Sequence, residues 1–209
     1  PAGNLSVNVT GTLTLRLAAR DAGVRRFLFA SSGAVLGRHA PPGDETTRTA
    51  PVSPYGAAKL AGEAYCLAFT ETYGVSTAVL RFSNVYGPGS AHKRSVVAEF
   101  CKRALRREPL LIFGDGRQTR DLLYVDDLVE AVRLCLRDPR ATGVFQLGCG
   151  VPVTVLEIAT TVRELAHRDL GIDLPVQFEP PRVGDVRESY YRIDRAREVL
   201  GFAPSTDLK

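Results

Sequence analysis

One stretch decides the fold: Arg25-Arg26-Phe27-Leu28-Phe29-Ala30-Ser31-Ser32-Gly33. Its apolar centre does not alternate with polar residues, which is typical of a strand buried on both faces of a parallel sheet. The serines and glycine that follow predict a loop at the carboxyl end of that strand. Before the strand, Leu5, Val9, Leu13 and Leu17 recur on one face of a helix expected over 6–22, which Gly23 ends.

The same order of elements repeats further along the chain. Prolines and glycines predict a loop over 38–54, followed by a helix over 55–73 and a second apolar strand over 75–82. Short apolar strands that alternate with helices predict a parallel α/β architecture. Further strands are expected near 110–113, 122–125, 144–147 and 176–178, and further helices over 93–107, 126–136, 154–167 and from Asp194 onward.

Composition excludes several classes of protein. The chain has 209 residues, of which 44% are hydrophobic and 24% charged, as in an ordinary globular domain. No apolar stretch is long enough to span a membrane. The net charge of +4 is spread along the chain, which favours phosphate-sized anions over nucleic acid as partners.

Cysteine and histidine usage indicates neither a disulfide framework nor a metal site. The histidines lack ligand spacing, and the cysteines lie far apart without a C-x-x-C pair (Cys66, Cys101, Cys135 and Cys149). Free thiols suit a reducing cytosol, so we expect a cytoplasmic protein. The absence of methionine leads us to expect a piece of a longer protein.

The sharpest chemical signal is Tyr55-Gly56-Ala57-Ala58-Lys59. Residues four apart on a helix share one face. The pKa of an unperturbed tyrosine is near 10, and a nearby ammonium lowers this pKa by stabilising the phenolate. A fall of three pKa units corresponds to about 4 kcal/mol. The spacing alone is common on amphipathic helices. Ser31 and Ser32 raise its significance, because a hydroxyl at the end of a parallel strand points toward the crevice where such sheets bind ligands.

Seven motifs follow one another along the chain. They are Asn8-Val9-Thr10-Gly11-Thr12, Ser31-Ser32-Gly33-Ala34-Val35, Ser53-Pro54-Tyr55-Gly56-Ala57-Ala58-Lys59, Leu80-Arg81-Phe82-Ser83-Asn84-Val85-Tyr86-Gly87-Pro88, Gly114-Asp115-Gly116 with Arg120-Asp121, Tyr124-Val125-Asp126-Asp127 and Arg182-Val183-Gly184-Asp185. In this order they resemble one family, the extended short-chain dehydrogenases/reductases. Within it the chain is most similar to NAD-dependent nucleotide-sugar epimerases and dehydratases, the UDP-glucose 4-epimerases above all, and the resemblance covers essentially the whole chain.

The resemblance implies the C-terminal part of a Rossmann-like, doubly wound parallel sheet plus a smaller α/β substrate-binding domain. Residues 1–86 would be the remnant of the NAD-binding domain, with the catalytic serine, tyrosine and lysine. Residues 87–209 would mainly bind the nucleotide sugar, with 126–150 returning to the Rossmann sheet. The family's first strands and its G-x-x-G-x-x-G loop have no match here, so we expect a chain cut at both ends.

The resemblance also assigns roles to single residues. Tyr55 would be the catalytic base, Lys59 would bind the nicotinamide ribose and lower the pKa of Tyr55, and Ser32 would hold the sugar 4-hydroxyl. Ser31 would join Tyr55 and Lys59 in binding the cofactor, NAD. A nucleotide-diphosphate sugar would be gripped by Asn84, Arg120 and Arg182, with Ser189 beside C2 of the sugar. Forked guanidinium donors suit a diphosphate.

Two positions help to choose the reaction. Family dehydratases carry Asp-Glu directly after the catalytic serine or threonine, and decarboxylases keep the glutamate, whereas this chain has Gly33 and Ala34. Neither residue can act as acid or base, which favours inversion at C4 over elimination or decarboxylation. A small residue at Ser189 predicts that acetylated sugars are also accepted; the alternative is that Ser189 is a surface strand residue and that Tyr190 or Tyr191 fills the space. Leu36 replaces a tyrosine usual in the family's Val-Tyr-Gly, which we interpret as a packing change.

Three alternatives stay open from the sequence. The protein could instead be an NADP-dependent nucleotide-sugar reductase or another epimerase of the family, because the residues that choose NAD or NADP have no counterpart in the chain. It could also be a non-catalytic truncated module. A homodimer through the helices at 6–22 and 55–73 is one candidate assembly.

Overall fold

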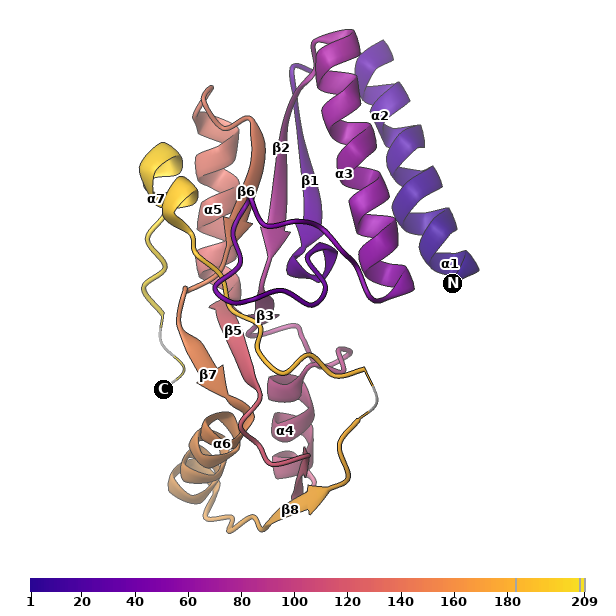
Figure 1. The fold of residues 1–209 in the computed structure, drawn as a ribbon. Coiled ribbons are helices and arrows are strands. Elements are labelled where there is room, and N and C mark those ends of the chain that lie inside the picture. Colours follow the sequence, from indigo (N-terminus) through magenta and orange to yellow (C-terminus); the bar gives the residue numbers. More distant parts are fainter. Residues whose placement is uncertain (183, 207, 209) are drawn as a thin grey trace.

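The computed structural model describes residues 1–182, 184–206 and 208 and divides into two parts (Figure 1). The upper part is a parallel three-stranded sheet in the order β1-β2-β6, with helices on both faces. Its strands are β1 (Arg26–Ser32), β2 (Ser76–Phe82) and β6 (Gly143–Leu147). The structure therefore confirms the parallel α/β architecture that the alternation of helices and apolar strands predicts.

Side chains of β2 alternate between the two faces of this sheet, as the period of a strand requires. Ala78 and Leu80 belong to a core cluster with residues of α5 (Val125–Arg137) and α7 (Asp194–Leu200). Val79, between them in sequence, packs with Phe29 and Cys66 on the side of α3. Both faces of the sheet are covered, which is why its strands are apolar without alternation.

The N-terminal helix is one continuous rod beside α3 (Pro54–Tyr73), formed by α1 (Ala2–Leu5), a π-helical stretch (Ser6–Thr10) and α2 (Gly11–Asp21). The buried face of this helix is not the one that the leucine spacing in the sequence predicts. The buried positions of α2 are Thr12 and Arg16, while the side chain of Leu17 is 37% exposed. Arg16 is buried because its guanidinium lies over the rings of Phe27 and Phe69 and donates to the carbonyl of Cys66.

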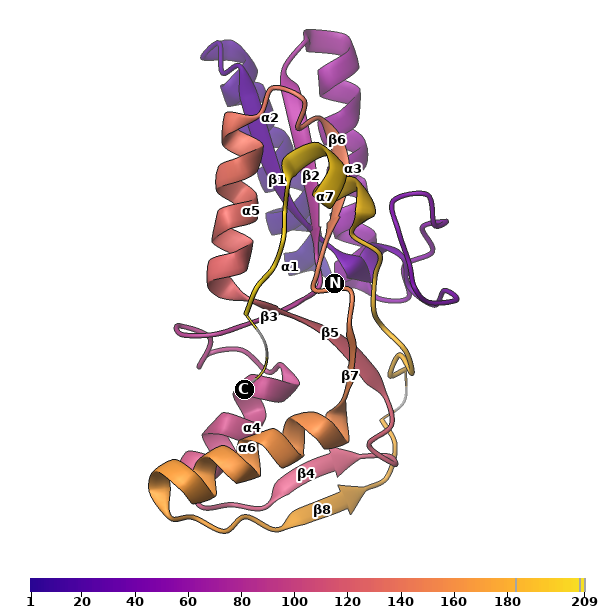
Figure 2. The same ribbon diagram turned by 90° about the vertical axis from the view of Figure 1, so that its left-hand side faces the viewer.

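The lower part is built from two small sheets and two helices (Figure 2). One sheet has the order β3-β5-β7, and the other pairs β4 with β8 in parallel. Their core lies between these strands and the helices α4 and α6. The elements are β3 (Asn84–Tyr86), α4 (Val96–Leu105), β4 (Leu110–Phe113), β5 (Thr119–Tyr124), β7 (Pro152–Thr154), α6 (Val155–Leu170) and β8 (Val176–Glu179).

The chain passes between the two parts several times. After β5 it enters α5 and then β6, which pairs with β2 from Ala78 opposite Gly143 onward. After β8 it climbs from the lower part back to α7 in the upper part (Figures 1 and 2). These crossings bring the carboxyl ends of β1 and β2 next to the top of the lower part. Among the described residues, no helix is both long and apolar enough to cross a membrane.

Candidate active site

Ser32 stands at the carboxyl end of β1, where the strand turns into a short 3-10 helix (Gly33–Val35). Its hydroxyl oxygen accepts a hydrogen bond from the backbone N–H of Ala34 at 3.2 Å, which caps that helix. Ser31, one position earlier, faces the opposite side of the strand and is buried. The two serines therefore have different surroundings, and only Ser32 faces a cavity.

Tyr55 and Lys59 lie on the first turns of α3, which begins beside the 3-10 helix. Ser53 caps α3 by accepting from the N–H of Gly56 at 3.0 Å, and Pro54 starts its first turn. A glycine is needed at position 56, because a β-carbon there would lie 2.5 Å from the carbonyl oxygen of Ala34. This close approach holds the start of α3 against the turn that follows Ser32.

The ammonium of Lys59 lies between the Tyr55 ring and the end of β1. Its Nζ is 5.8 Å from the centroid of that ring and donates to the carbonyl of Ala30 at 2.9 Å. Partial burial lowers the pKa of Lys59 from its ordinary value. The Tyr55 side chain is 41% exposed. A phenol next to a held ammonium is an arrangement that can stabilise a phenolate.

A buried ion pair lies directly beneath these residues. Glu63, one turn after Lys59 on α3, receives hydrogen bonds from Arg81 Nε at 2.9 Å and from Nη2 at 2.7 Å. The two side chains are at most 5% exposed. The hydroxyl of Ser31 donates to the same carboxylate. The pair joins α3 to β1 and β2 next to Ser32 and Lys59, and no spacing in the sequence indicates it.

A cavity of about 310 Å³ opens in front of Ser32 and is rich in hydroxyl groups. Its wall includes Ser189, whose Oγ is 3.0 Å from the hydroxyl of Tyr191. Burial raises the pKa of Tyr191 above its ordinary value, so this phenol is protonated at neutral pH. The hydroxyl-bearing residues of the wall are Ser32, Ser53, Ser83, Ser189 and Tyr191.

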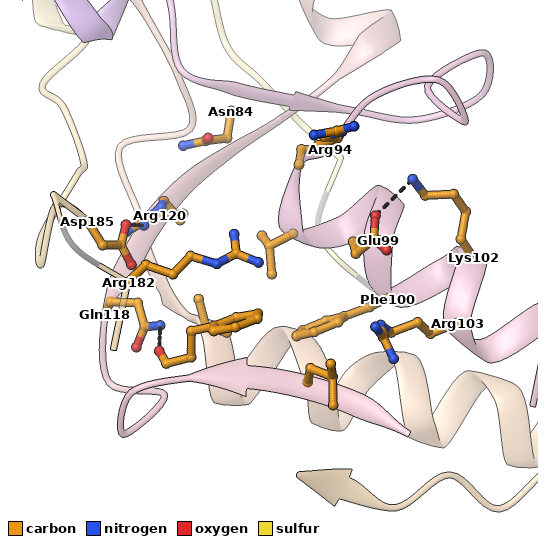
Figure 3. Close-up of a pocket in the computed structure, with 15 residues that line it drawn as sticks. Asn84, Arg94, Glu99, Phe100, Lys102, Arg103, Gln118, Arg120, Arg182 and Asp185 are labelled. Carbon is orange, nitrogen blue, oxygen red and sulfur yellow. Dashed lines mark hydrogen bonds and ion pairs between the residues drawn. The ribbon is translucent and has the colours of Figure 1, made fainter. Parts of the chain in front are cut away.

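A second cavity of about 620 Å³ lies in the lower part between α4, β4 and the segment around Arg182 (Figure 3). Arg182 projects into it, and its guanidinium carbon is 3.7 Å from the centroid of the Phe113 ring. The wall carries five cations and two carboxylates. They are Arg94, Lys102, Arg103, Arg120 and Arg182, and Glu99 and Asp185.

The two cavities meet at three residues that line both, Asn84, Arg120 and Asp185. Arg120 is held from three sides: it donates to Asp185 at 2.5 Å and to the carbonyls of Thr119 and Val186 at 2.8 Å each. This arrangement places an arginine and an amide at the junction between a cationic cavity and a hydroxyl-lined one. Such a pair of connected cavities can take an elongated ligand with an anionic middle and a polyhydroxylated end.

The structure thus brings together most of the residues singled out from the sequence. Ser32 and Ser189 share the smaller cavity, while Asn84, Arg120 and Arg182 line the larger one. The other three predicted site residues, Ser31, Tyr55 and Lys59, line neither cavity. Val183, within the last motif, lies outside the described residues. The chemical roles of these residues, of Tyr55 and Lys59, and of Ser31 as a cofactor contact stay predictions. Leu36 is fully buried in a cluster with Val35 and Tyr191.

Sequence reasoning misses several residues that form the walls. Lys102 and Arg103 lie on the last turn of α4 and Arg94 just before the helix, where basic residues are typical of an ordinary solvated surface. Phe113 carries no motif that distinguishes it from residues of a core strand, and the sequence suggests Tyr191 only as an alternative filler of the space beside Ser189. No spacing signal could have identified them, because they reach the cavities from separate elements. No cluster of potential metal ligands occurs among the residues that the structure describes.

Comparison with known proteins gives one consistent picture. The model of the NAD dependent epimerase/dehydratase family matches residues 1–148. The UDP-glucose 4-epimerase of Mycolicibacterium smegmatis is 39% identical, over 100% of this chain and 66% of the relative. The chain thus spans slightly less than two thirds of the length of that relative.

Solved structures agree with the sequence relatives. The UDP-glucose 4-epimerase of Thermotoga maritima with UDP-glucose has a TM-score of 0.90 and 38% identity, covering 100% of this chain and 67% of that one. The UDP-glucose 4-epimerase of Thermus thermophilus in complex with NAD has a TM-score of 0.87 and 34% identity, covering 97% and 66%. Together with the fold and the arrangement of its cavities, these matches show that the chain belongs to the NAD-dependent epimerase/dehydratase family, within the extended short-chain dehydrogenases/reductases.

Proposed function

We propose that this chain carries the catalytic and substrate-binding residues of an NAD-dependent UDP-sugar 4-epimerase. The observation that carries the proposal is the pair of connected cavities, which meet at Arg120 and of which the smaller contains Ser32. Beside them, Lys59 lies next to the ring of Tyr55. Anion-binding and hydroxyl-lined spaces therefore adjoin each other, and Ser53, two residues before Tyr55, lines the smaller one.

The larger cavity suits the nucleotide diphosphate. Arginine presents a planar fork of donors that matches phosphate oxygens, and Arg120 and Arg182 enter the cavity from different elements. Arg182 lies over the ring of Phe113, and this contact helps to hold its guanidinium in the cavity. The hexose would then extend past Asn84 into the smaller cavity, toward Ser32.

Tyr55 would take the proton of the sugar 4-hydroxyl and later return it. Lys59 makes this feasible at neutral pH by stabilising the phenolate, and the bond from Lys59 to the carbonyl of Ala30 fixes the position of the ammonium. Ser32 would hold the 4-oxygen by a hydrogen bond. When bound, NAD supplies a hydride acceptor that takes the C4 hydrogen and gives it back to either face of the sugar.

The chain's own residues fit the nicotinamide end of NAD. A dinucleotide in such a fold binds along the carboxyl ends of the parallel strands, where Tyr55 is exposed and Lys59 is within reach. The 209 residues contain no G-x-x-G-x-x-G run for the pyrophosphate. The choice of NAD over NADP therefore rests on the family rather than on residues of this chain.

Position 33 supports inversion over elimination or decarboxylation. A β-carbon on Gly33 would overlap the hydroxyl oxygen of Tyr191, so the space that an acidic side chain would need is filled. Ala34 follows it with no titratable group. Without an additional acid or base near Ser32, transfer of a hydride and one proton at C4 is the simplest chemistry.

We also propose that two copies associate through the helices α2 and α3. Large apolar side chains are exposed along them, including Leu15 at 62%, Tyr65 at 41% and Tyr73 at 48%. Neighbouring exposed apolar residues often mark a subunit interface. Sedimentation equilibrium of the chain and of Leu15→Glu tests this: a dimer that the substitution converts to monomer is expected, and a monomeric unaltered chain contradicts it.

The activity is tested by incubating a full-length protein that contains this chain with UDP-glucose, without added NAD, and following UDP-galactose by chromatography. Interconversion toward the same equilibrium mixture from either sugar is expected, because the hydride taken from C4 is returned. Stoichiometric consumption of added NADPH in place of interconversion would identify a reductase and contradict the proposal.

A further inference from the structure

Tyr191 is held rigidly at the sugar end of the connected cavities. Its segment is clamped on two sides: the N–H of Asp121 on β5 donates to the carbonyl of Ser189 at 2.8 Å, and Gly43 pairs with the backbone of residues 190 and 192 at 3.1 and 2.8 Å. The side chain of Tyr191 is only 4% exposed. Its ring stacks on that of His39, with the ring centroids 5.9 Å apart and the planes inclined by 20°.

The phenol end of Tyr191 reaches the backbone directly after Ser32. A β-carbon built on Gly33 would overlap the Tyr191 oxygen and would lie 2.5 Å from the ring carbon Cζ. The same oxygen lies 3.0 Å from Ser189 Oγ, and both residues line the smaller cavity together with Ser32. The glycine at position 33 thus makes room for the tyrosine, and the two hydroxyl groups end up next to each other in the wall.

Paired hydroxyl groups have a defined hydrogen-bonding capacity. Either oxygen can donate to the other, after which one O–H hydrogen and several lone pairs remain for a ligand. The phenol keeps its proton because burial raises its pKa. A group that can both accept and donate, such as a sugar hydroxyl, satisfies this pair, whereas an apolar substituent would leave it unsatisfied.

We propose that Tyr191 is a specificity-determining residue, whose hydroxyl acts with that of Ser189 to bind one hydroxyl group of the hexose beside Ser32. The inference rests on the proposed function and goes beyond it, because it assigns sugar recognition to a residue distinct from the predicted acid–base and diphosphate groups. Leu36 contributes by packing in the same buried cluster as Tyr191.

Isothermal titration of the chain with UDP-glucose and, separately, with UDP tests the inference. Tyr191→Phe keeps the ring and removes the hydroxyl, so we expect UDP-glucose to bind about three- to tenfold more weakly while the affinity for UDP is unchanged. Tyr190→Phe, at the neighbouring position, is the matched control and should bind both ligands like the unaltered chain. Thermal unfolding of each variant confirms that it is folded.

Ser189→Ala and the double variant complete the test. If the two hydroxyl groups act as one unit, the double variant should lose no more than the larger single loss, that is, the effects are not additive. Additive losses, an unchanged affinity of Tyr191→Phe for UDP-glucose, or an equal loss for UDP and UDP-glucose would overturn the inference. If the unaltered chain fails to bind UDP at all, the proposed function itself is contradicted and the inference falls with it.

Discussion

Replacing Arg81 by methionine tests how strongly the buried ion pair fastens α3 to the sheet. Glu63 would then keep only the hydrogen bond from Ser31, in a site where both partners of the pair are at most 5% exposed. Removing one partner of a buried ion pair costs about 3–5 kcal/mol, because it leaves an uncompensated charge. For a domain of this size, 1 kcal/mol shifts the midpoint of thermal unfolding by about 2–4 °C, so a fall of about 6–20 °C is expected.

The assay is thermal and urea unfolding, each followed by circular dichroism, for the chain and three variants. Arg81→Met combined with Glu63→Met removes both charges and should recover most of the loss, because a buried pair replaced by apolar residues is often nearly neutral. Arg168→Met breaks the exposed pair with Asp169 and should change the free energy of unfolding by less than about 1 kcal/mol. A loss below about 1 kcal/mol for Arg81→Met, or a double variant as unstable as the single one, would refute the reasoning.

Further outcomes are expected at the site. In the full-length protein, Tyr55→Phe should lower kcat by several orders of magnitude with little change in substrate affinity. Tyr65, which is equally exposed on the same helix, is the control, and Tyr65→Phe should leave kcat unchanged. Normal turnover by the Tyr55→Phe variant would show that Tyr55 is not the catalytic base. The pKa of Lys59 should lie below the usual range for lysine in NMR spectra of the ¹³C-methylated chain. Between this lowered pKa and the ordinary lysine pKa the unfolded chain binds more protons than the folded one, so the free energy of unfolding should rise with pH in that range. An ordinary titration of Lys59 would contradict the role of burial. Ser189→Tyr should cut kcat/KM for UDP-N-acetylglucosamine at least tenfold, about 1.4 kcal/mol, and spare UDP-glucose, whereas equal losses would exclude a gate at this position. Calorimetric titration of the 209-residue chain with NAD should show no binding at micromolar ligand, since the chain has no glycine-rich loop, and a micromolar affinity would show that this loop is dispensable.

Local signals in the sequence predict the elements that have a strong pattern of their own. The strand at 110–113 is observed with the predicted bounds, because its apolar run is closed by Gly114-Asp115-Gly116. The strands β3 and β7 escape prediction, since each has only three residues and exists by pairing with β5 rather than by its own pattern.

The walls of the site are harder to predict for the same physical reason. Asn84, Arg120 and Arg182 are found through motifs that resemble a family, not through any local signal that they meet. Arg16 is a case in which the local pattern predicts the wrong environment. A charged side chain is expected in solvent, but the guanidinium of Arg16 is buried over two aromatic rings. Contacts between residues distant in sequence decide both cases, and a one-dimensional pattern does not contain them.

The shared wall of the two cavities has a consequence for affinity. Because Asn84, Arg120 and Asp185 border both spaces, a ligand anchored in the larger one presents its other end to the smaller one at a high effective concentration. For the proposed nucleotide-sugar ligand, a few hydroxyl contacts, each weak in water, would then be enough to orient the tethered hexose, whereas the same hexose free in solution would have no such advantage. In the proposed reaction this chelate effect would let the hexose leave its contacts and rotate while the nucleotide stays bound.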